Sequence, residues 1–115
     1  MIYGIGVDII EVERIQSISE KNPKFLTRIF TETEIAYCSK MKNKYQHLAA
    51  RFAAKEAFFK AIGRKIQWTD IGIKNLPSGK PVLEILSEEK FPFSEANVSI
   101  SHIKDYAVAT VILSS

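Results

Sequence analysis

The sequence predicts an α+β fold in a single domain that spans residues 1–115. Two observations support this prediction. Apolar residues recur with helical spacing from Val12 to Ile62, whereas residues 1–10 and the chain after Gly63 alternate with the period of two that is typical of strands. One strand, then helices, then strands is not the alternating order of a βαβ-wound sheet. A chain of 115 residues is also of the size of one domain.

The first predicted strand covers Met1–Ile10. Side chains of a strand alternate between its two faces, so one face carries only apolar residues, Ile5, Val7 and Ile9. The other face is kept small by two glycines and holds one carboxylate, in the order Gly4, Gly6 and Asp8.

Four helices are expected after this strand. Helical spacing indicates Val12 to Ser19 and Lys24 to Phe30. The sequence Thr31-Glu32-Thr33-Glu34 is a capping box, which predicts a helix that continues to about Met41. The fourth helix should run from Tyr45 to Ile62, with Gly63 as its C-cap, and its apolar residues cover nearly all of its circumference. Such a helix is buried on several sides.

Two hairpins are expected after the helices. Asp70–Asn75 and Pro81–Leu86 are joined by the turn sequence Pro77-Ser78-Gly79-Lys80, and Asn97–His102 and Tyr106–Leu113 are joined by residues 103–105. Between the hairpins, residues 87–95 are predicted to form a loop whose aromatic residues, Phe91 and Phe93, pack on the core.

The net charge is +3, and the basic residues are unevenly distributed. Basic residues are frequent in the first half of the chain and should form a basic surface that suits a phosphate-bearing ligand or an acidic protein. They include Lys40, Lys42, Lys44, Arg51, Lys55 and Lys60. Because they are not interleaved with aromatic residues, we expect no nucleic-acid partner.

No apolar run is long enough to cross a membrane and no signal peptide is recognisable, so neither a membrane nor secretion is expected. The single cysteine, Cys38, excludes an intramolecular disulfide, fits a reducing cytoplasm and has no activating neighbour in the sequence. The only histidines are His47 and His102, so no zinc site is expected.

Glu56 and Lys60 lie one turn apart on the fourth predicted helix. Most pairs with this spacing are solvated surface pairs, but an apolar surround favours a binding or catalytic site. Asp8 is open to a similar choice, since an aspartate near the end of a strand often caps the next helix. If Asp8 and Glu56 lie together, their charges repel unless a cation such as Mg²⁺ lies between them.

Four segments in series resemble the motifs of the holo-acyl-carrier-protein synthases, a family of 4′-phosphopantetheinyl transferases. The segments are residues 6–15 (GVDIIEVERI), 51–63 (RFAAKEAFFKAIG), 78–81 (SGKP) and 98–109 (VSISHIKDYAVA). They have the family's order and spacing over essentially the whole chain. Small departures from the family's pattern occur at Ile62 and Ile103.

The resemblance implies transfer of 4′-phosphopantetheine from coenzyme A to a serine of apo acyl carrier protein, for fatty acid biosynthesis. By similarity, Asp8 and Glu56 bind Mg²⁺ with oxygens of the coenzyme A pyrophosphate, and Lys60 contacts the same pyrophosphate. Glu56 or a water on the metal is the base. Arg51 and His102 hold the 3′-phosphate, whereas Pro81 packs on the adenine with Lys80 close by. Without the resemblance, His102 is equally well explained as a half-buried structural residue, and His47 is interpreted as structural or surface.

The resemblance also implies a homotrimer with active sites shared between subunits, so that Asp8 and Glu56 meet across an interface. The acidic carrier protein is expected on the early helices, at Arg14, Ile18, Lys21, Lys24, Phe25 and Arg28.

Two other classes of protein remain as alternatives. An acyltransferase that uses coenzyme A needs no metal, and the Asp8/Glu56 pair argues against it. In a nucleotide- or RNA-binding module, the Glu56–Lys60 pair is merely structural. Metal-dependent modification of a carrier protein distinguishes the transferase from both.

Overall fold

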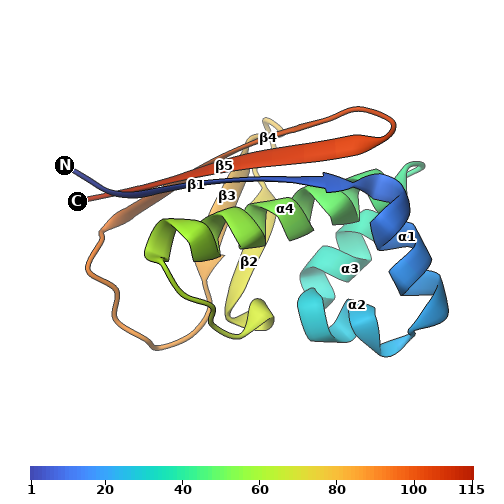
Figure 1. Cartoon of the computed structure of the whole chain (residues 1–115), viewed down its shortest axis with the longest axis horizontal. Helices are drawn as coiled ribbons and strands as arrows, with labels where there is room; N and C mark the ends of the chain where they lie inside the picture. Colours follow the sequence, from blue (N-terminus) through green and yellow to red (C-terminus); the bar gives the residue numbers. More distant parts are fainter.

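The computed structural model describes all residues 1–115 and confirms the α+β class. A three-stranded antiparallel sheet has the order β1 (Ile2–Glu11), β5 (Tyr106–Ser114), β4 (Glu95–His102). In Figure 1, α4 (Lys44–Ile62) runs along one face of this sheet, and the two chain ends lie together at one end of the strands.

The remaining elements pack around α4. Helices α1 (Val12–Lys21), α2 (Lys24–Ile29) and α3 (Glu32–Ser39) cluster near its N-terminal half (Figure 1). A short 3₁₀ turn, Trp68–Asp70, leads into the predicted hairpin, which forms a separate two-stranded sheet of β2 (Ile71–Asn75) and β3 (Pro81–Ile85). The expected helices and strands are all present, with ends that differ by a few residues.

Glycines bring α4 close to β1. A Cβ atom on Gly4 would overlap the carbonyl oxygen of Ala61, and one on Gly6 would overlap that of Ala57. Only glycine therefore permits backbone-to-backbone contact along this face. The small face of β1 that the sequence predicted is the face that receives α4.

The helix ends follow the predicted signals. Thr31 Oγ1 accepts a hydrogen bond from the Glu34 backbone amide (3.2 Å), and Glu34 Oε1 accepts one from the Thr31 amide (2.8 Å), which completes the capping box. Gly63 ends α4 in the left-handed region, with φ of 82°. Helix α3 ends at Ser39, slightly before the predicted Met41.

The loop after β3 also behaves as predicted. The rings of Phe91 and Phe93 lie 6.0 and 6.1 Å from that of the fully buried Phe58 of α4, both edge-on. This geometry is favourable for aromatic pairs. The two rings therefore close the core beyond the end of the small sheet.

Two residues assigned to the basic surface are instead buried. Lys55 is 0% exposed and Arg51 is 3% exposed. The Lys55 ammonium donates hydrogen bonds to Glu34 Oε1 (2.7 Å), the Ile29 carbonyl (2.8 Å) and the Trp68 carbonyl (3.1 Å). A buried lysine is tolerated because all three of its donors have partners. The basic residues in the sequence indicated only the composition of this part of the chain. The position of each residue on α4 decides whether its side chain is buried.

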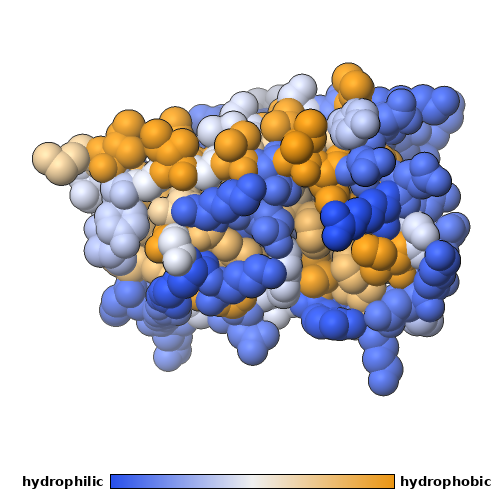
Figure 2. Space-filling model, viewed as in Figure 1, coloured by the Kyte–Doolittle hydropathy of each residue, from blue (hydrophilic) through white to orange (hydrophobic).

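The outer face of β1, at one edge of the main sheet, is apolar and uncovered. Figure 2 shows apolar side chains along the upper edge of the molecule, where β1 runs in Figure 1. Ile5, Val7 and Ile9 are each more than half exposed. An exposed apolar row of this kind marks a surface for association.

Candidate active site

Asp8 and Lys60 form the centre of the first cluster of candidate residues. Lys60 Nζ donates hydrogen bonds to Asp8 Oδ1 (3.2 Å) and to the Val7 carbonyl (3.0 Å). The Asp8 side chain is only 16% exposed, whereas that of Lys60 is 55% exposed. Helix α1 is capped at Glu11 and not at Asp8, so the capping alternative for Asp8 is wrong. A carboxylate held beside a mobile cation can bind a ligand that approaches from solvent.

Glu56 does not pair with Lys60. Its nearest cation is Lys65, whose Nζ lies 3.7 Å from Glu56 Oε1, and its side chain is 23% exposed. The i,i+4 surface pair that the spacing suggested is therefore replaced by two other contacts. Both leave the carboxylates of Asp8 and Glu56 accessible.

Asp8 and Glu56 lie on the same side of one chain. Gly4 faces Ala61 and Gly6 faces Ala57, so two residues of β1 correspond to one turn of α4. Continuation of this register places Asp8 over the preceding turn, which contains Glu56. The register places the two carboxylates on the same flank of α4 within one subunit, so a site that uses both does not require them to meet across an interface.

This pair of carboxylates suits a hard divalent cation. Magnesium is typically held by one or two carboxylates together with substrate phosphates. The structure has no group of three or more His, Cys, Asp or Glu side chains arranged for a metal ion. Two carboxylates next to a lysine nevertheless provide the donor set of a metal that is shared with a phosphate substrate.

The second cluster of candidate residues surrounds Arg51. Its Nη2 donates to Asn75 Oδ1 (2.6 Å), its Nη1 donates to the His47 carbonyl (3.3 Å), and its guanidinium lies 4.5 Å from the centre of the Tyr37 ring. The buried Nε has no hydrogen-bond partner. A buried guanidinium without a carboxylate partner is a typical anion-binding group.

Arg51 opens into a cavity of about 280 Å³, which we name the phosphate cavity. No carboxylate lines it. Its lining residues are Tyr37, His47, Ala50, Arg51, Asn75, Gly79, Pro81, Ile100 and His102. The structure thus brings together Arg51, Pro81 and His102, as predicted, while the exposed Lys80 flanks the cavity without lining it.

Three lining residues with polar side chains were not predicted as site residues from the sequence: Tyr37, His47 and Asn75. The centres of the His47 and His102 rings are 5.3 Å apart, so His47 is part of this cavity and not an unrelated structural residue. Burial lowers the pKa of His47 below its ordinary value, and the nearby His102 and Arg51 lower it further. The sequence signal that could have identified His47 is its spacing of four from Arg51, which places the two basic residues on the same face of the helix.

The two clusters lie on opposite flanks of α4. Five residues separate Arg51 from Glu56 and nine separate it from Lys60, which correspond to rotations of about 140° and 180° around the helix. The strands agree, because Asp8 lies on β1 and His102 on β4, the two edges of the sheet. Helix α4 therefore separates the phosphate cavity from the Asp8–Lys60 pair within one chain.

Comparison with known proteins identifies the family. The model of the 4′-phosphopantetheinyl transferase superfamily matches residues 4–111. The chain belongs to this superfamily. A holo-[acyl-carrier-protein] synthase from Geobacillus sp. (strain WCH70) is 47% identical, with 98% of this chain and 97% of the relative aligned. The predicted family and enzyme class, a phosphopantetheinyl transferase, are both confirmed.

Solved structures of the same superfamily share the fold. A Bacillus anthracis holo-(acyl-carrier-protein) synthase in complex with CoA (3′,5′-ADP) is 41% identical, with a TM-score of 0.85 and coverage of 100% and 99% of the two chains. The Neisseria meningitidis holo-[acyl-carrier-protein] synthase is 33% identical, with a TM-score of 0.87 and full coverage of both chains.

Within this transferase fold, the expected carrier-protein surface is only partly available. Arg14, Lys21, Lys24 and Arg28 are exposed on α1 and α2, and Ile18 is half-buried. Phe25, expected to provide apolar contact, is instead buried, with its ring 6.3 Å from Phe30 and 6.4 Å from Phe52. The spacing of Phe25 predicted the helix correctly. The apolar side of so short a helix, however, packs against the core and is not available to a partner.

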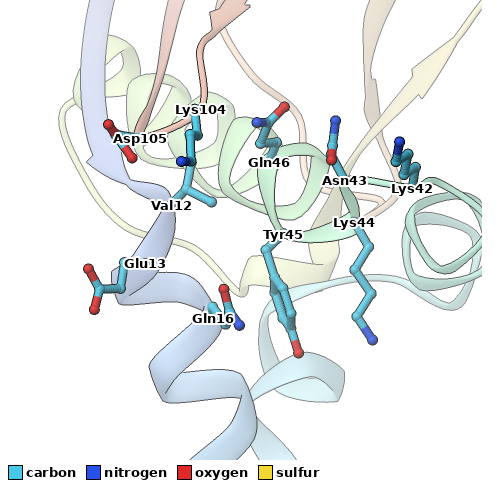
Figure 3. Close-up of a pocket in the computed structure, with 10 residues that line it drawn as sticks. All are labelled: Val12, Glu13, Gln16, Lys42, Asn43, Lys44, Tyr45, Gln46, Lys104 and Asp105. Carbon is cyan, nitrogen blue, oxygen red and sulfur yellow. The ribbon is translucent and has the colours of Figure 1, made fainter.

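The largest cavity of the transferase holds none of the predicted catalytic residues. It measures about 420 Å³ and lies between the start of α1, the start of α4 and the β4–β5 turn (Figure 3). Its charged residues have mixed signs, with Glu13 and Asp105 opposite three lysines, Lys42, Lys44 and Lys104. The Val12 amide donates to the Asp105 carbonyl (2.9 Å) at its floor, which joins the two elements.

No helix of the structure has the length and apolar character that a membrane span requires.

Proposed function

We propose that this chain transfers 4′-phosphopantetheine from coenzyme A to a serine hydroxyl of apo acyl carrier protein and releases adenosine 3′,5′-bisphosphate. The observation that carries the proposal is the Asp8–Lys60 pair, 3.2 Å apart, beside Glu56 in a chain of this superfamily. Relatives that share nearly its full length are named as holo-[acyl-carrier-protein] synthases. The product serves fatty acid biosynthesis, and the free thiol of Cys38 fits a cytoplasmic location.

In the reaction, the serine oxygen forms a bond to the β-phosphorus of coenzyme A while the bond from that phosphorus to the bridging oxygen breaks. Negative charge grows on the leaving phosphate, and such a reaction needs charge neutralisation more than covalent help. Lys60 supplies it, because its ammonium is half-exposed on a flexible stem next to Asp8.

Asp8 and Glu56 would hold Mg²⁺, which when bound neutralises charge on the pyrophosphate oxygens. Glu56, directly or through a water, is the candidate to receive the proton of the entering serine. Arg51 and His102 bind the 3′-phosphate, with Pro81 against the adenine and Lys80 at the margin. Arg14, Ile18, Lys21, Lys24 and Arg28 receive the acidic carrier protein.

We infer that the complete site forms between two copies of the chain in a homotrimer. The phosphate cavity and the Asp8–Lys60 pair lie on opposite flanks of α4, so one subunit places them on different sides. A head-to-tail ring brings one flank of each subunit against the other flank of the next. Burial of the apolar row Ile5, Val7 and Ile9 would stabilise such a ring.

Mass spectrometry of the carrier protein tests the proposed reaction. Incubation with coenzyme A, an apo acyl carrier protein and Mg²⁺ should add one phosphopantetheine group to the carrier, and a chelator should prevent this addition. Absence of the adduct, or an adduct formed equally well with chelator, would contradict the proposal.

Substitution of Glu56 provides the first sharp prediction. Glu56→Gln keeps the shape of the side chain but removes its charge, so we expect turnover to fall by at least about a hundredfold. The oligomer should persist in size-exclusion chromatography. Glu84→Gln is the matched control, since Glu84 pairs with Lys74 on the small sheet, and it should retain full activity. Normal turnover by Glu56→Gln would show that the metal assignment is wrong.

A further inference from the structure

Two imidazoles lie in contact in the phosphate cavity. The ring of His47 is 5.3 Å from that of His102 and is tilted by 64° to it, and the Tyr37 ring lies 6.1 Å away on its other side. Both histidines line the cavity that Arg51 also lines, and the buried Arg51 Nε has no hydrogen-bond partner. Without a ligand, three basic side chains thus converge on a space that contains no carboxylate.

The groups that face His47 come from each element around it. Helix α4 provides Arg51, β4 provides His102 and α3 provides Tyr37, whereas the β2–β3 hairpin provides only uncharged residues. Burial, His102 and Arg51 all lower the pKa of His47. His47 is therefore mostly neutral near pH 7 when the cavity is empty, because even an unperturbed imidazole is largely uncharged there.

We propose that His47 is a third phosphate-binding residue, which takes up a proton when the 3′-phosphate of coenzyme A enters the cavity. The proposal rests on the proposed function and assigns His47 the part of a specificity residue for the 3′-phosphorylated nucleotide. Affinity for that phosphate then rises as the pH falls from about 8 towards 6, and the effect requires His47.

Electrostatics gives the direction of this effect. A phosphate monoester has its second pKa near 6, so at neutral pH it enters mainly as a dianion. The dianion attracts a proton to the imidazole beside it and turns an acceptor nitrogen into a charged donor. Burial favours the neutral form of empty His47, and repulsion from His102 and Arg51 adds to this effect. The two negative charges of the ligand act in the opposite direction.

Calorimetry detects this proton directly. Adenosine 3′,5′-bisphosphate is titrated into the full-length protein at pH 7.0 in several buffers that differ in ionisation enthalpy, and the slope gives the number of protons taken up. Adenosine 5′-monophosphate, which lacks the 3′-phosphate, is the ligand control. His47→Gln is the test variant, and Gln46→Ala, next to it in sequence but outside the phosphate cavity, is the matched control.

The expected result is proton uptake with the bisphosphate that falls in His47→Gln and is unchanged in Gln46→Ala. His47→Gln should bind the bisphosphate roughly tenfold more weakly at pH 6 and closer to normally at pH 8, whereas the monophosphate should be unaffected. Thermal unfolding shows whether the variant is folded. Should His47→Gln fail to fold, a ¹⁵N-labelled wild-type protein gives the same answer through the imidazole resonances of His47, whose titration must move to higher pH with the bisphosphate.

Unchanged proton uptake and pH dependence in His47→Gln would overturn the inference, as would failure of the wild type to bind the bisphosphate. The transfer assay with the carrier protein tests the proposed function, and its outcome does not depend on the role of His47. Normal pantetheinyl transfer without the His47 effect overturns this inference alone, and proton-linked binding without transfer overturns the proposed function alone.

Discussion

Two buried cations on α4, Arg51 and Lys55, lie one turn apart and have opposite roles. All three donors of Lys55 are used, on Glu34 and two backbone carbonyls, so it joins α4 to α2, α3 and the 3₁₀ turn. Arg51 lines an open cavity, and its buried Nε has no hydrogen-bond partner. A cation with all its donors satisfied stabilises the fold, whereas one left incomplete binds a ligand.

Removal of Lys55 tests its structural role. Lys55→Met leaves the Glu34 carboxylate buried without its cation, so we expect the free energy of unfolding to fall by about 3–5 kcal/mol. Urea denaturation measures this change. Lys74→Met is the matched control, because the exposed Lys74–Glu84 pair should contribute less than about 1 kcal/mol. A loss below about 1 kcal/mol in Lys55→Met would contradict the structural role.

The Cys38 thiol provides a second test at this scale. Burial raises its pKa to about 11, and the thiolate is the reactive form. We expect iodoacetamide at pH 8 to leave the folded protein unmodified and to label Cys38 rapidly in urea, as measured by mass spectrometry. Labelling of the folded protein at the rate of a free thiol would show that the helix opens locally. The sequence interpretation of Cys38 as inert had a different basis, the absence of an activating neighbour in the sequence.

At the scale of elements, the contact between β1 and α4 sets the geometry of the candidate site. Gly4 and Gly6 let the helix backbone approach the strand, and Asp8 continues the same face. The positions of Lys60 and Glu56 relative to Asp8 thus depend on the fact that Gly4 and Gly6 have no side chain. Glycine acts here as a spacer between catalytic residues and not as a turn residue.

Gly6→Ala tests this spacing. The added methyl group would overlap the Ala57 carbonyl oxygen, and backbone atoms cannot move away as a side chain can. We expect a loss of about 3 kcal/mol or more in the free energy of unfolding, together with reduced transfer activity. In Gly72→Ala, the control, the new methyl group would meet only side chains, Leu86 at 3.2 Å and Thr31 at 3.8 Å, so the loss should be small. Equal losses in both variants would argue against a special contact.

The sequence predicted those elements whose signals are local. The Thr31–Glu34 capping box, the Gly63 cap and the alternation of β1 all depend on neighbours in the chain, and all were confirmed. Lys55 and Phe25 were misassigned because their partners come from elsewhere in the chain, and the contact between His47 and His102 was not predicted for the same reason. Burial of a charged or aromatic residue on an almost entirely apolar helix cannot be predicted from periodicity alone.

The candidate site was predicted through motifs and not through geometry. Asp8, Glu56 and Lys60 could be named because their order and spacing resemble a known family. That Lys60 contacts Asp8 instead of Glu56, and that α4 separates Arg51 from Lys60, depends on how the helix is rotated against the sheet. This rotation is set by the glycine contacts. The alternating glycines predicted a small face on β1, but the sequence carries no direct signal for which turn of α4 packs against each glycine.

For the whole molecule, the separation of the two clusters predicts that inactive subunits complement each other. If each site takes Glu56 from one copy and Arg51 from the next, a mixture of Glu56→Gln and Arg51→Gln subunits contains sites in which both halves are intact. A head-to-tail trimer that contains both variants has one site of three in which both halves are intact, so the mixed oligomers should show about a third of wild-type activity.

Co-expression of the two variants with different affinity tags, followed by purification through both tags, provides the mixed oligomers. Each variant alone is the control, with thermal unfolding to show that it is folded. Activity of the mixture that equals the mean of the two single variants would mean that each site belongs to one chain, and the shared-site proposal would then be wrong.

The order of strands in the main sheet also has a consequence for folding. The central strand β5 pairs with both β1 and β4, and its Thr110 lies opposite Val7, about a hundred positions earlier in the chain. During synthesis, β1 therefore has no strand to pair with until β5, which ends at residue 114, has been made. Until then its apolar residues lie in an unpaired segment. Closure of so long a loop is slow, so the nascent chain depends on α4 and its aromatic neighbours for early compaction.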